Sequence, residues 1–430
     1  MTDRLCLLHL TTEDWYWGFH CLDRARLAAW GNLTCRYTDR QWKRQIVNIL
    51  LLSTESSVQV AFIQPLAQHL RKQGHHVTLA CSDDPGEYGQ SFVEPLRRMG
   101  FEVLVVPMRR TISPWRNLLA GIQLYRILRR RRFDVVHTQT AIAGMIGRVA
   151  GSFARVPVIV YSAHAFPFHE HLSRWLVTLY ALLERFAARL CDVIVVDSGC
   201  VRQRGLKYKV AAPDRIRVIQ MGIDTERFDP AKYRAERNSI RAEFGLRPDA
   251  TVIGAVGRFV NDKGWDTFLH AVSVLTKRLP DVDVQCLLVG GGPLHKELQD
   301  LSRVLNLNGR VVFAEYQRDI PKVMAALDIY MLPTRREGFG VTFIEAMSME
   351  VPVIASRIQP LDEIVMDGRT GVLADVGDPN AFAEAAGHML ADPELRRRIG
   401  EAGRRRVIEQ FEQALMCKAH EHLFQQLMER

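Results

Sequence analysis

From Ile46 onward, short apolar runs alternate with helical patterns along the chain, and this alternation limits the possible folds more than any other feature. The runs are nearly continuously apolar, which is typical of parallel strands that helices cover on both faces. The predicted strands form two series. The first is at 47–53, 76–81, 103–106, 135–137, 158–161, 193–196 and 216–219, and the second at 252–256, 284–289, 311–313, 329–332 and 353–355.

Between the two series lie a turn-rich, charged segment, 222–230, and a polar helical pattern, 232–244. The sequence therefore predicts an α/β protein of two doubly wound, Rossmann-like halves, 46–221 and 222–403. In open sheets of this kind a ligand binds at the carboxyl ends of the strands, so we expect the site in a crevice between the halves. Residues 404–430 are predicted to form one or two charged helices that pack back toward the first half.

Residues 1–45 lack a sustained period and stand outside this scheme. They hold Trp15, Trp17, Trp30 and Trp42, four of the seven tryptophans, and three of the eight cysteines. We interpret them as an N-terminal extension of unknown role, either an appended interaction segment or sequence that packs poorly.

Composition places the chain of 430 residues among ordinary globular proteins, with 47% hydrophobic and 24% charged residues. The eight cysteines form no C-x-x-C pair and no zinc spacing with histidine, which suits a reducing compartment. Apolar runs such as 156–163 fall far short of the ~20 residues of a membrane span, and 5–10 is too short for a signal peptide. We therefore expect a cytoplasmic protein rather than a secreted or integral membrane one.

Positive charge is in excess and unevenly spread. Lysine and arginine number 57 against 48 aspartates and glutamates, a net charge of +9. Arginines crowd the segment 126–132, and Arg109, Arg110 and Arg116 precede it. Such a cluster can meet anionic lipid, nucleic acid or a phosphate-bearing substrate. It can equally be a solvated helix end whose cations complement the helix dipole.

The segment 257–264, GRFVNDKG, follows the strand that opens the second half. Its first glycine allows a sharp turn, after which Arg258 and Lys263 bring two cations to the crevice. Such a pair suits a pyrophosphate leaving group, because arginine grips oxygens through paired hydrogen bonds and lysine supplies a point charge. The alternative is a solvated turn with ordinary surface cations.

A second loop, 335–340, leads from a strand into a helix N-terminus, where free amides and the helix dipole attract negative charge. Glu337 lies in this loop and Glu345 lies within the helix, so both carboxylates can accept hydrogen bonds from the hydroxyls of a sugar and a ribose. A second interpretation of Glu345 is open. Thr342-x-x-Glu345 also spells a capping box, in which the carboxylate bonds only backbone.

These two segments, with their R-x4-K pair and their glutamates in an E-x7-E pattern, resemble the retaining GT-B glycosyltransferases of family 4. The segments 219–228 and 350–371 resemble the same family, and the similarity extends from about Ile46 to about Gln410. The resemblance implies the GT-B fold, in which two Rossmann-like domains face each other across a cleft. The donor nucleotide then lies on the second domain and the acceptor on the first.

The resemblance also implies roles for individual side chains. Arg258 and Lys263 match the pair that holds the donor diphosphate. Glu337 matches the acid that bonds the donor sugar, and Glu345 the acid that bonds the ribose. His164, in YSAHAFPFHE, matches a histidine near the reacting carbon, although a lone histidine after a strand is more often structural.

Backbone groups complete the implied donor site. The amides of Phe339 and Gly340 match donors to the sugar and phosphate, and the backbone near 316–318 matches the place where the base is held. The predicted catalytic residues are His164, Arg258, Lys263 and Glu337. The predicted donor-binding residues are Arg258, Lys263, Tyr316, Gln317, Glu337, Gly338, Phe339, Gly340 and Glu345, with no metal ligand.

For the reaction, the resemblance implies retention of configuration at the anomeric carbon. No carboxylate of the set is an obvious nucleophile. The leaving group then departs, the acceptor hydroxyl attacks from the same face, and the donor phosphate takes its proton, with electrostatic stabilisation as the largest contribution. No D-x-D motif stands beside a strand end in the context that a metal site of this family needs, so we expect metal independence. The resemblance implies no cofactor. UDP is favoured as the donor nucleotide, with GDP as the alternative.

Two segments depart from the family pattern. The first strand ends Ser53-Thr-Glu-Ser-Ser57, where many relatives have paired glycines that touch the donor phosphate. Gln220-Met221-Gly222 replaces the commoner Pro-Asn-Gly of the linker. The first of these departures leaves the first-half side of the phosphate site without the glycines that the family pattern places there.

The segments 136–151 and 161–170 look most like bacterial enzymes that build exopolysaccharide or O-antigen repeats on a polyprenyl diphosphate. The implied acceptor is then a lipid-linked saccharide, and the arginines at 126–132 would meet the anionic inner face of the cytoplasmic membrane. Two alternatives stay open. One is a soluble small-molecule acceptor, and the other is a non-catalytic GT-B subunit that scaffolds a synthase.

Two other functional classes are disfavoured by the residues themselves. Val289-Gly-Gly-Gly-Pro293 approaches a nicotinamide-binding fingerprint, but His295 stands where its last glycine belongs. No aromatic-interleaved basic face or known module accompanies the arginines, so we expect no nucleic-acid partner.

Overall fold

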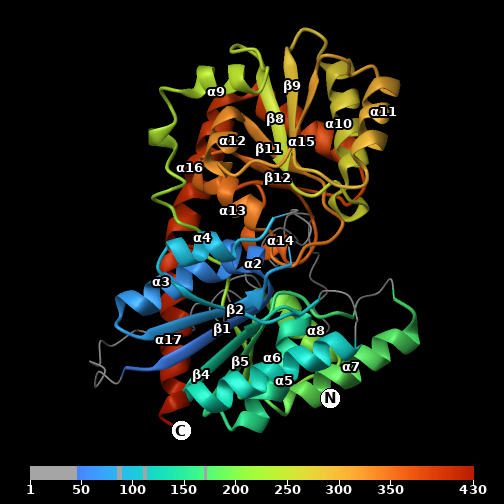
Figure 1. Cartoon of the computed structure of the whole chain (residues 1–430). Helices are drawn as coiled ribbons and strands as arrows, with labels where there is room; N and C mark the ends of the chain where they lie inside the picture. The colour runs from blue at the N-terminus through green and yellow to red at the C-terminus, as the bar shows by residue number, and fades with distance from the viewer. Residues whose placement is uncertain (1–45, 85–89, 110–113, 169–171) are drawn as a thin grey trace, which may run out of the picture. The chain divides into compact units, whose positions relative to one another are not determined.

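The computed structural model describes residues 46–84, 90–109, 114–168 and 172–430 (Figure 1). The predicted extension, residues 1–45, lies outside the described residues. Two sheets organise the described part, one of seven strands and one of six, and each pairing between their strands is parallel. The predicted α/β class with two doubly wound halves is confirmed. We call the part built on the seven-stranded sheet the first lobe and the part built on the six-stranded sheet the second lobe.

The first sheet has the strand order β3-β2-β1-β4-β5-β6-β7. Its strands are β1 (Asn48–Glu55), β2 (His76–Ser82), β3 (Glu102–Val105), β4 (Val135–Gln139), β5 (Val158–Ala163), β6 (Val193–Val196) and β7 (Ile216–Val218). The chain order reverses between β1 and β4, the point at which doubly wound sheets place their ligands.

The second sheet has the order β10-β9-β8-β11-β12-β13, with the reversal between β8 and β11. Its strands are β8 (Thr251–Val256), β9 (Val284–Val289), β10 (Val311–Ala314), β11 (Ile329–Leu332), β12 (Val353–Ser356) and β13 (Val372–Ala374). The sequence prediction misses β13, because three residues are too few to form a distinct apolar run. The two predicted donor loops follow β8 and β11, and therefore lie at the switch point.

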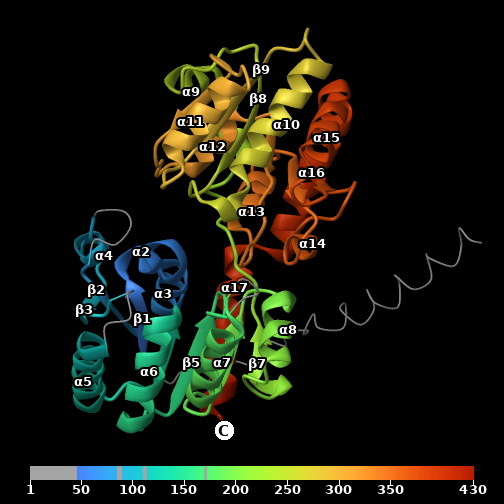
Figure 2. The same cartoon turned by 90° about the vertical axis from the view of Figure 1, so that its right-hand side faces the viewer.

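Helices cover the sheets of both lobes (Figures 1 and 2). In the first lobe they are α2 (Ser56–Val58), α3 (Gln64–Lys72), α4 (Val93–Arg98), α5 (Pro114–Arg131), α6 (Ala141–Ala154), α7 (Arg174–Ala188) and α8 (Gly199–Lys207). Those that follow are α9 (Arg237–Glu243), α10 (Trp265–Arg278), α11 (His295–Val304), α12 (Ile320–Ala326), α13 (Val341–Ser348), α14 (Leu361–Ile364), α15 (Pro379–Ala391), α16 (Pro393–Gln410) and α17 (Gln413–Met428). The helical pattern predicted at 232–244 is shorter in the structure, because α9 begins only at Arg237.

A buried ion pair fixes α7 to the rest of the first lobe. Arg148 of α6 and Glu184 of α7 lie 2.9 Å apart (Nη2 to Oε2), and both side chains are almost wholly buried. The guanidinium carbon of Arg148 lies 3.9 Å from the centroid of the Tyr161 ring in β5. Burial lowers the pKa of Arg148, but the charge of Glu184 more than offsets this, so the pKa stays above its ordinary value. The pair joins α6, α7 and β5 through their inner faces.

Helix α17 comes after the second lobe in the chain, yet it packs on the first. The Nε2 atom of His69 in α3 lies 2.7 Å from Oε2 of Glu421 in α17. The rings of His420 in α17 and His137 in β4 are 5.3 Å apart between centroids. Residues from the far end of the described chain therefore belong to the core of the first lobe.

The two segments that connect the lobes run side by side. The amide of Ile223 donates to the carbonyl oxygen of Phe411 at 2.8 Å, and the amide of Gln413 donates to the carbonyl oxygen of Ile223 at 2.9 Å. Gly222 allows this approach, because a Cβ atom there would lie 2.7 Å from Cα of Gln413. The residue limits assigned to the domains stay predictions.

Candidate active site

Gly264 shapes the loop that follows β8. It comes directly after the 3-10 turn η5 (Asn261–Lys263) and precedes α10, with φ of +67°. A Cβ atom on it would lie 1.9 Å from the carbonyl oxygen of Pro333, so only glycine fits. The loop after β8 is therefore pressed against the loop after β11.

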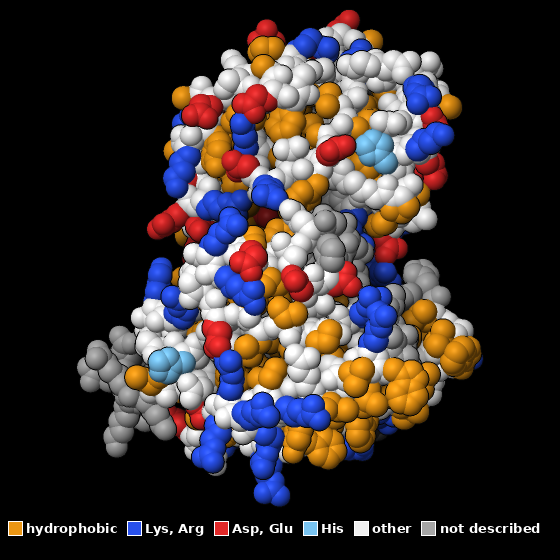
Figure 3. All heavy atoms as spheres, in the orientation of Figure 1, with side chains coloured by type: hydrophobic (Ala, Val, Ile, Leu, Met, Phe, Trp, Pro, Cys, Tyr) orange, Lys and Arg blue, Asp and Glu red, His pale blue; other side chains and the backbone are white. Residues whose placement is uncertain are grey.

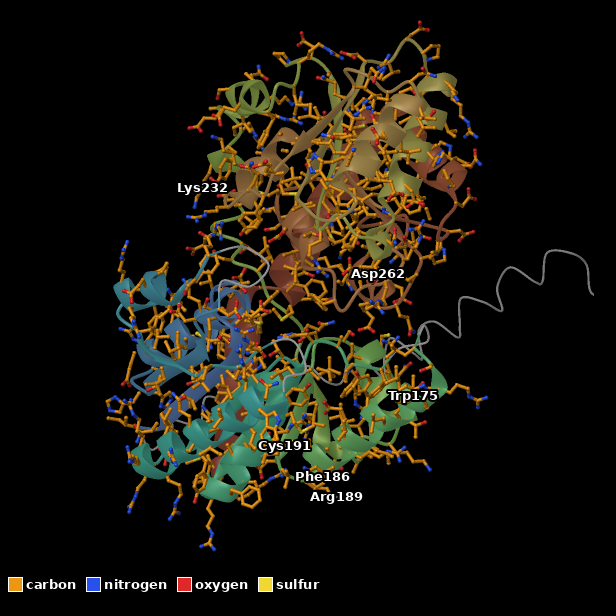
Figure 4. The ribbon with its side chains drawn as sticks, turned by 45° about the vertical axis from the view of Figure 1, so that its right-hand side comes forward. Trp175, Phe186, Arg189, Cys191, Lys232 and Asp262 are labelled. Atoms are coloured by element: carbon orange, nitrogen blue, oxygen red, sulfur yellow. The ribbon has the colours of Figure 1, made fainter. Side chains whose placement is uncertain are left out.

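Asp262, labelled in Figure 4, ties these two loops together. Its carbonyl oxygen accepts hydrogen bonds from the amide of Arg335 at 2.7 Å and from the hydroxyl of Thr334 at 3.0 Å. Its carboxylate pairs with Arg336 at 2.5 Å. The two predicted donor loops thus form one structural unit at the switch point of the second sheet.

Lys263 and Glu337, predicted from separate loops, are in contact. Lys263 Nζ lies 2.5 Å from Glu337 Oε1, and only 21% and 10% of the two side chains are exposed. The shielding strengthens the electrostatics of both groups relative to bulk water. Arg258 is exposed at the same turn, and its carbonyl oxygen accepts a hydrogen bond from Trp265 Nε1 at 2.8 Å. The site thus offers cations for phosphate oxygens and a carboxylate for hydroxyls.

Glu345 does not belong to a capping box, and that interpretation of the sequence is wrong. Gly340 occupies the N-cap position of α13, so Thr342 lies inside the first turn. The Thr342 hydroxyl instead accepts a hydrogen bond from the Tyr330 hydroxyl at 2.7 Å. Burial raises the pKa of Glu345 to about 8, and the charge of Arg227 opposes this shift. The carboxyl group of Glu345, near the start of α13, is thus not used to cap the helix and can bond a ligand.

Glu345→Gln is expected to stabilise the folded protein at alkaline pH. Folded Glu345 keeps its proton up to a pKa of about 8, whereas the unfolded chain loses it near ~4.3, so wild-type stability falls between these pH values. Glutamine does not titrate. We expect the variant to have an unfolding free energy roughly 4–5 kcal/mol higher than that of wild type at pH ~8, and a nearly equal one at pH ~4. Urea unfolding at both pH values measures this, and a difference independent of pH would contradict it.

His164, just after β5, is held at both ring nitrogens. Nδ1 lies 2.7 Å from Asp197 Oδ2, and Nε2 lies 3.0 Å from Gln139 Oε1. Burial lowers the pKa of His164, but the charge and hydrogen bond of Asp197 more than offset this and raise it above the ordinary value. Two oxygen acceptors on opposite sides suit a ring that carries protons on both nitrogens.

Asp197 and Gln139 are absent from the predicted site. Asp197 directly follows β6, and Gln139 is the last residue of β4. Because β4, β5 and β6 are neighbours in a parallel sheet, their carboxyl ends meet at one edge. A search for polar residues at the ends of strands adjacent to that of His164 would have found both.

The structure brings the loop of Glu337 close to His164. A Cβ atom on Gly338 would lie 3.1 Å from the carbonyl oxygen of His164. Phe339 is buried, with its ring centroid 5.9 Å from that of Phe411. Tyr316 and Gln317 instead follow β10, the edge strand that β9 separates from β8.

The first-strand loop uses its hydroxyl groups within the first lobe. β1 extends to Glu55, and α2 begins at the next residue. The hydroxyls of Thr54 and Thr140 lie 2.6 Å apart, and Ser56 Oγ accepts the amide of Phe92 at 3.0 Å. Internal contacts therefore occupy the segment in which many relatives carry paired glycines.

Two negative findings concern the described residues only. No group of three or more His, Cys, Asp or Glu side chains among them is placed to hold a metal ion, and metal independence stays a prediction. None of the helices in the described ranges is long and apolar enough to cross a membrane.

Two family models match the chain. "Glycosyltransferase Family 4" matches residues 59–227, and "Glycosyl transferases group 1" matches residues 236–406. His164 falls within the first match. The predicted residues of the donor loops fall within the second.

Known proteins similar to this chain include enzymes and solved structures. The UDP-Gal:alpha-D-GlcNAc-diphosphoundecaprenol alpha-1,3-galactosyltransferase of Escherichia coli is 27% identical over 354 residues, 82% of this chain and 89% of the relative. The alpha-maltose-1-phosphate synthase of Mycolicibacterium smegmatis is 30% identical over 295 residues, 64% and 75% of the two chains. The structure of Anabaena HepE with UDP and glucose matches 88% of this chain and 100% of its own with a TM-score of 0.76 and 20% identity, a likeness of fold.

Proposed function

The chain belongs to the glycosyltransferases of group 1 and family 4, and we propose that it is a retaining enzyme that uses a UDP-sugar and a polyprenyl-diphosphate-linked saccharide. The observation that carries the proposal is the 2.5 Å contact between Lys263 Nζ and Glu337 Oε1. In a nucleotide sugar, a single oxygen joins the negatively charged diphosphate to the sugar ring, which carries hydroxyl groups. The pair matches these with a cation and a carboxylate side by side.

The relatives support the finer parts of the proposal. The name of the Escherichia coli enzyme gives UDP-Gal as its donor and a diphosphoundecaprenol-linked sugar as its acceptor. The Anabaena structure was solved with UDP and glucose. In our proposal Arg258 and Lys263 grip the diphosphate, Glu337 bonds the transferred sugar, and Glu345 bonds the ribose.

The proposed reaction balances without an enzyme nucleophile. The bond between the anomeric carbon and the phosphate oxygen breaks, and the acceptor hydroxyl forms the new bond on the same face. Its proton passes to the departing phosphate oxygen. Lys263 and Arg258 stabilise the negative charge that develops there, and the ring of His164, held by Asp197, lies near the reacting carbon.

Nucleotide binding tests the donor site. We expect the wild-type protein to bind UDP more tightly than GDP or ADP in titration calorimetry. Arg258→Ala should weaken UDP binding about 10- to 100-fold, because a charge-assisted contact to phosphate is lost. Arg303→Ala, a change at an exposed arginine of α11 paired with Asp300, serves as the control and should bind UDP like wild type. A protein that binds none of the three nucleotides would favour the scaffold alternative.

Transfer assays test the acceptor and the stereochemistry. The preferred UDP-sugar is offered with a polyprenyl-diphosphate-linked saccharide and, separately, with the same saccharide in free form. We expect transfer to the lipid-linked form, with the donor's anomeric configuration preserved in the proton coupling of the product. Transfer only to the free saccharide would favour a soluble acceptor, and an inverted product would exclude retention.

A further inference from the structure

Helix α5 carries apolar side chains on its solvent-facing side. They recur at helical spacing of three and four residues and are Trp115, Leu118, Leu119 and Ile122. Trp115 is 78% exposed and Leu119 64% exposed. The opposite side of the same helix contributes Leu124 and Leu128 to the core of the first lobe. α5 is therefore apolar on both faces, whereas a surface helix usually turns a polar face to water.

Helix α7 repeats this arrangement. Its exposed apolar residues, again at helical spacing, are Trp175, Leu179, Leu182, Leu183 and Phe186. Trp175 is 67% exposed and Phe186 54% exposed, and both are labelled in Figure 4. The ion pair of Glu184 with Arg148 holds the inner side of α7 against α6. Because its inner side is already packed, α7 cannot rotate to bury these exposed apolar side chains in the core.

The two exposed stripes lie on the same side of the first sheet. α6 packs against both α5 and α7, and all three helices lie in front of the sheet in Figure 2. Figure 3 shows hydrophobic side chains gathered at the lower right of the molecule, over the region where Figure 1 places α5 and α7. We call the exposed apolar side chains of these two helices the outer apolar face. Single exposed apolar residues are ordinary, but a contiguous set marks an interaction surface.

Cations border the outer apolar face. The exposed arginines at the end of α5 are Arg126, Arg129, Arg130, Arg131 and Arg132. Arg174 begins α7 and Arg189 follows it, and both are exposed. Among these, Arg131 also contacts Glu102 on the neighbouring strand β3. Apolar side chains with a border of arginine are the composition of surfaces that lie in the interface of an anionic bilayer.

We propose that the outer apolar face docks on an anionic lipid bilayer, with the side chains of α5 and α7 in the headgroup boundary and the arginines on lipid phosphates. A second copy of the chain fits this face less well, because a symmetric pairing would bring the two arginine borders together. A bilayer supplies both an apolar layer and negative charge, and so matches both parts of the surface.

The orientation that follows connects the face to the active site. The helices of a doubly wound lobe run opposite to its strands, so Trp115 and Trp175 lie toward the carboxyl edge of the sheet. His164 lies at this edge, and α7 begins at Arg174 in the same segment of chain. The face would therefore hold the acceptor side of the site beside the membrane. This last step rests on the proposed function, whereas the docking itself does not.

Co-sedimentation of the full chain with vesicles tests the docking. We expect the protein to sediment with vesicles of equal parts phosphatidylcholine and phosphatidylglycerol at low salt, and much less with phosphatidylcholine alone. The double variant Trp175→Ser/Phe186→Ser should bind the anionic vesicles about tenfold more weakly, because it removes apolar area from the interface. Arg129→Glu/Arg130→Glu should weaken binding as well, most strongly at low salt.

A control and a second readout make the outcomes decisive. Val304→Ser alters an apolar residue on α11 of the second lobe that is 76% exposed, and should sediment like wild type. UDP binding and thermal unfolding, unchanged in each variant, would show that the fold persists. If both double variants sediment like wild type, or if they only convert a dimer to a monomer in gel filtration, the proposal is overturned. The vesicle assay needs neither donor nor acceptor, so its failure is distinct from failure of the proposed function.

Discussion

Lys263→Ala is expected to lower kcat for sugar transfer by about a thousandfold, the upper range for the loss of one stabilising group in a shielded site. The ammonium of Lys263 lies at the turn after β8 in contact with Glu337, where the proposal places the departing diphosphate. Negative charge grows there in the transition state, so the loss should appear mainly in kcat, while Arg258 retains much of the ground-state binding. Initial rates of UDP release in the presence of acceptor measure the effect.

The control for this experiment is Lys322→Ala, which removes a lysine of α12 that pairs with Glu243 of α9. We expect its kcat to equal that of wild type. Thermal unfolding of Lys263→Ala is needed beside the rates, because the change leaves the shielded carboxylate of Glu337 without this partner. A folded Lys263→Ala protein with wild-type kcat would remove Lys263 from the mechanism.

Asp197→Asn is expected to lower kcat/KM by about a hundredfold, within the range for disabling a positioned acid or base. Asp197 holds Nδ1 of His164 and raises the pKa of its ring. In the variant the charge of Asp197 is lost, whereas burial, which lowers that pKa, persists. If the doubly protonated ring is the active form, activity falls as pH rises through the pKa of His164, and this fall should move to lower pH. A pH profile of kcat/KM measures the shift.

The same substitution should change stability in a pH-dependent way. A histidine whose folded pKa is raised stabilises the fold fully below its ordinary pKa of 6.5, and loses this effect as pH rises through the folded pKa. The melting temperature of Asp197→Asn should therefore fall further below that of wild type at pH ~5 than at pH ~9. Asp214→Asn, at an exposed aspartate of the first lobe, is the control and should match wild type in both measurements. An equal deficit at both pH values, with an unmoved activity profile, would contradict the role of Asp197.

The fold can be predicted from this sequence because each parallel strand, buried on both faces, appears as a nearly continuous run of apolar residues. The prediction fails where such a run is too short, or where a helical pattern is interrupted. β13 has three residues, and the pattern at 232–244 is divided between a 3-10 turn at Pro230–Lys232 and α9. The first error omits an edge strand and the second misplaces the start of a helix, and neither changes the two-sheet architecture.

The donor loops can be predicted because their glycines and charges are consecutive in the chain. The environment of His164 cannot be predicted in this way, since Gln139 and Asp197 are single residues on different strands that only the sheet brings together. The buried pair of Arg148 and Glu184 cannot be predicted from the sequence either, because the two residues lie on different helices that only the fold brings together. The status of Glu345 depended on which residue caps α13, and only backbone geometry at Gly340 decides this.

The packing of α17 on the first lobe has a consequence for how the protein is made. A ribosome completes the second lobe before it releases α17, yet Phe424 and His420 of that helix lie beside His137 of β4. During synthesis one side of the core of the first lobe therefore stays uncovered while the whole second lobe is produced. The first lobe is thus synthesised first, but its packing can be completed only last. We therefore expect the nascent first lobe to expose apolar surface until α17 emerges.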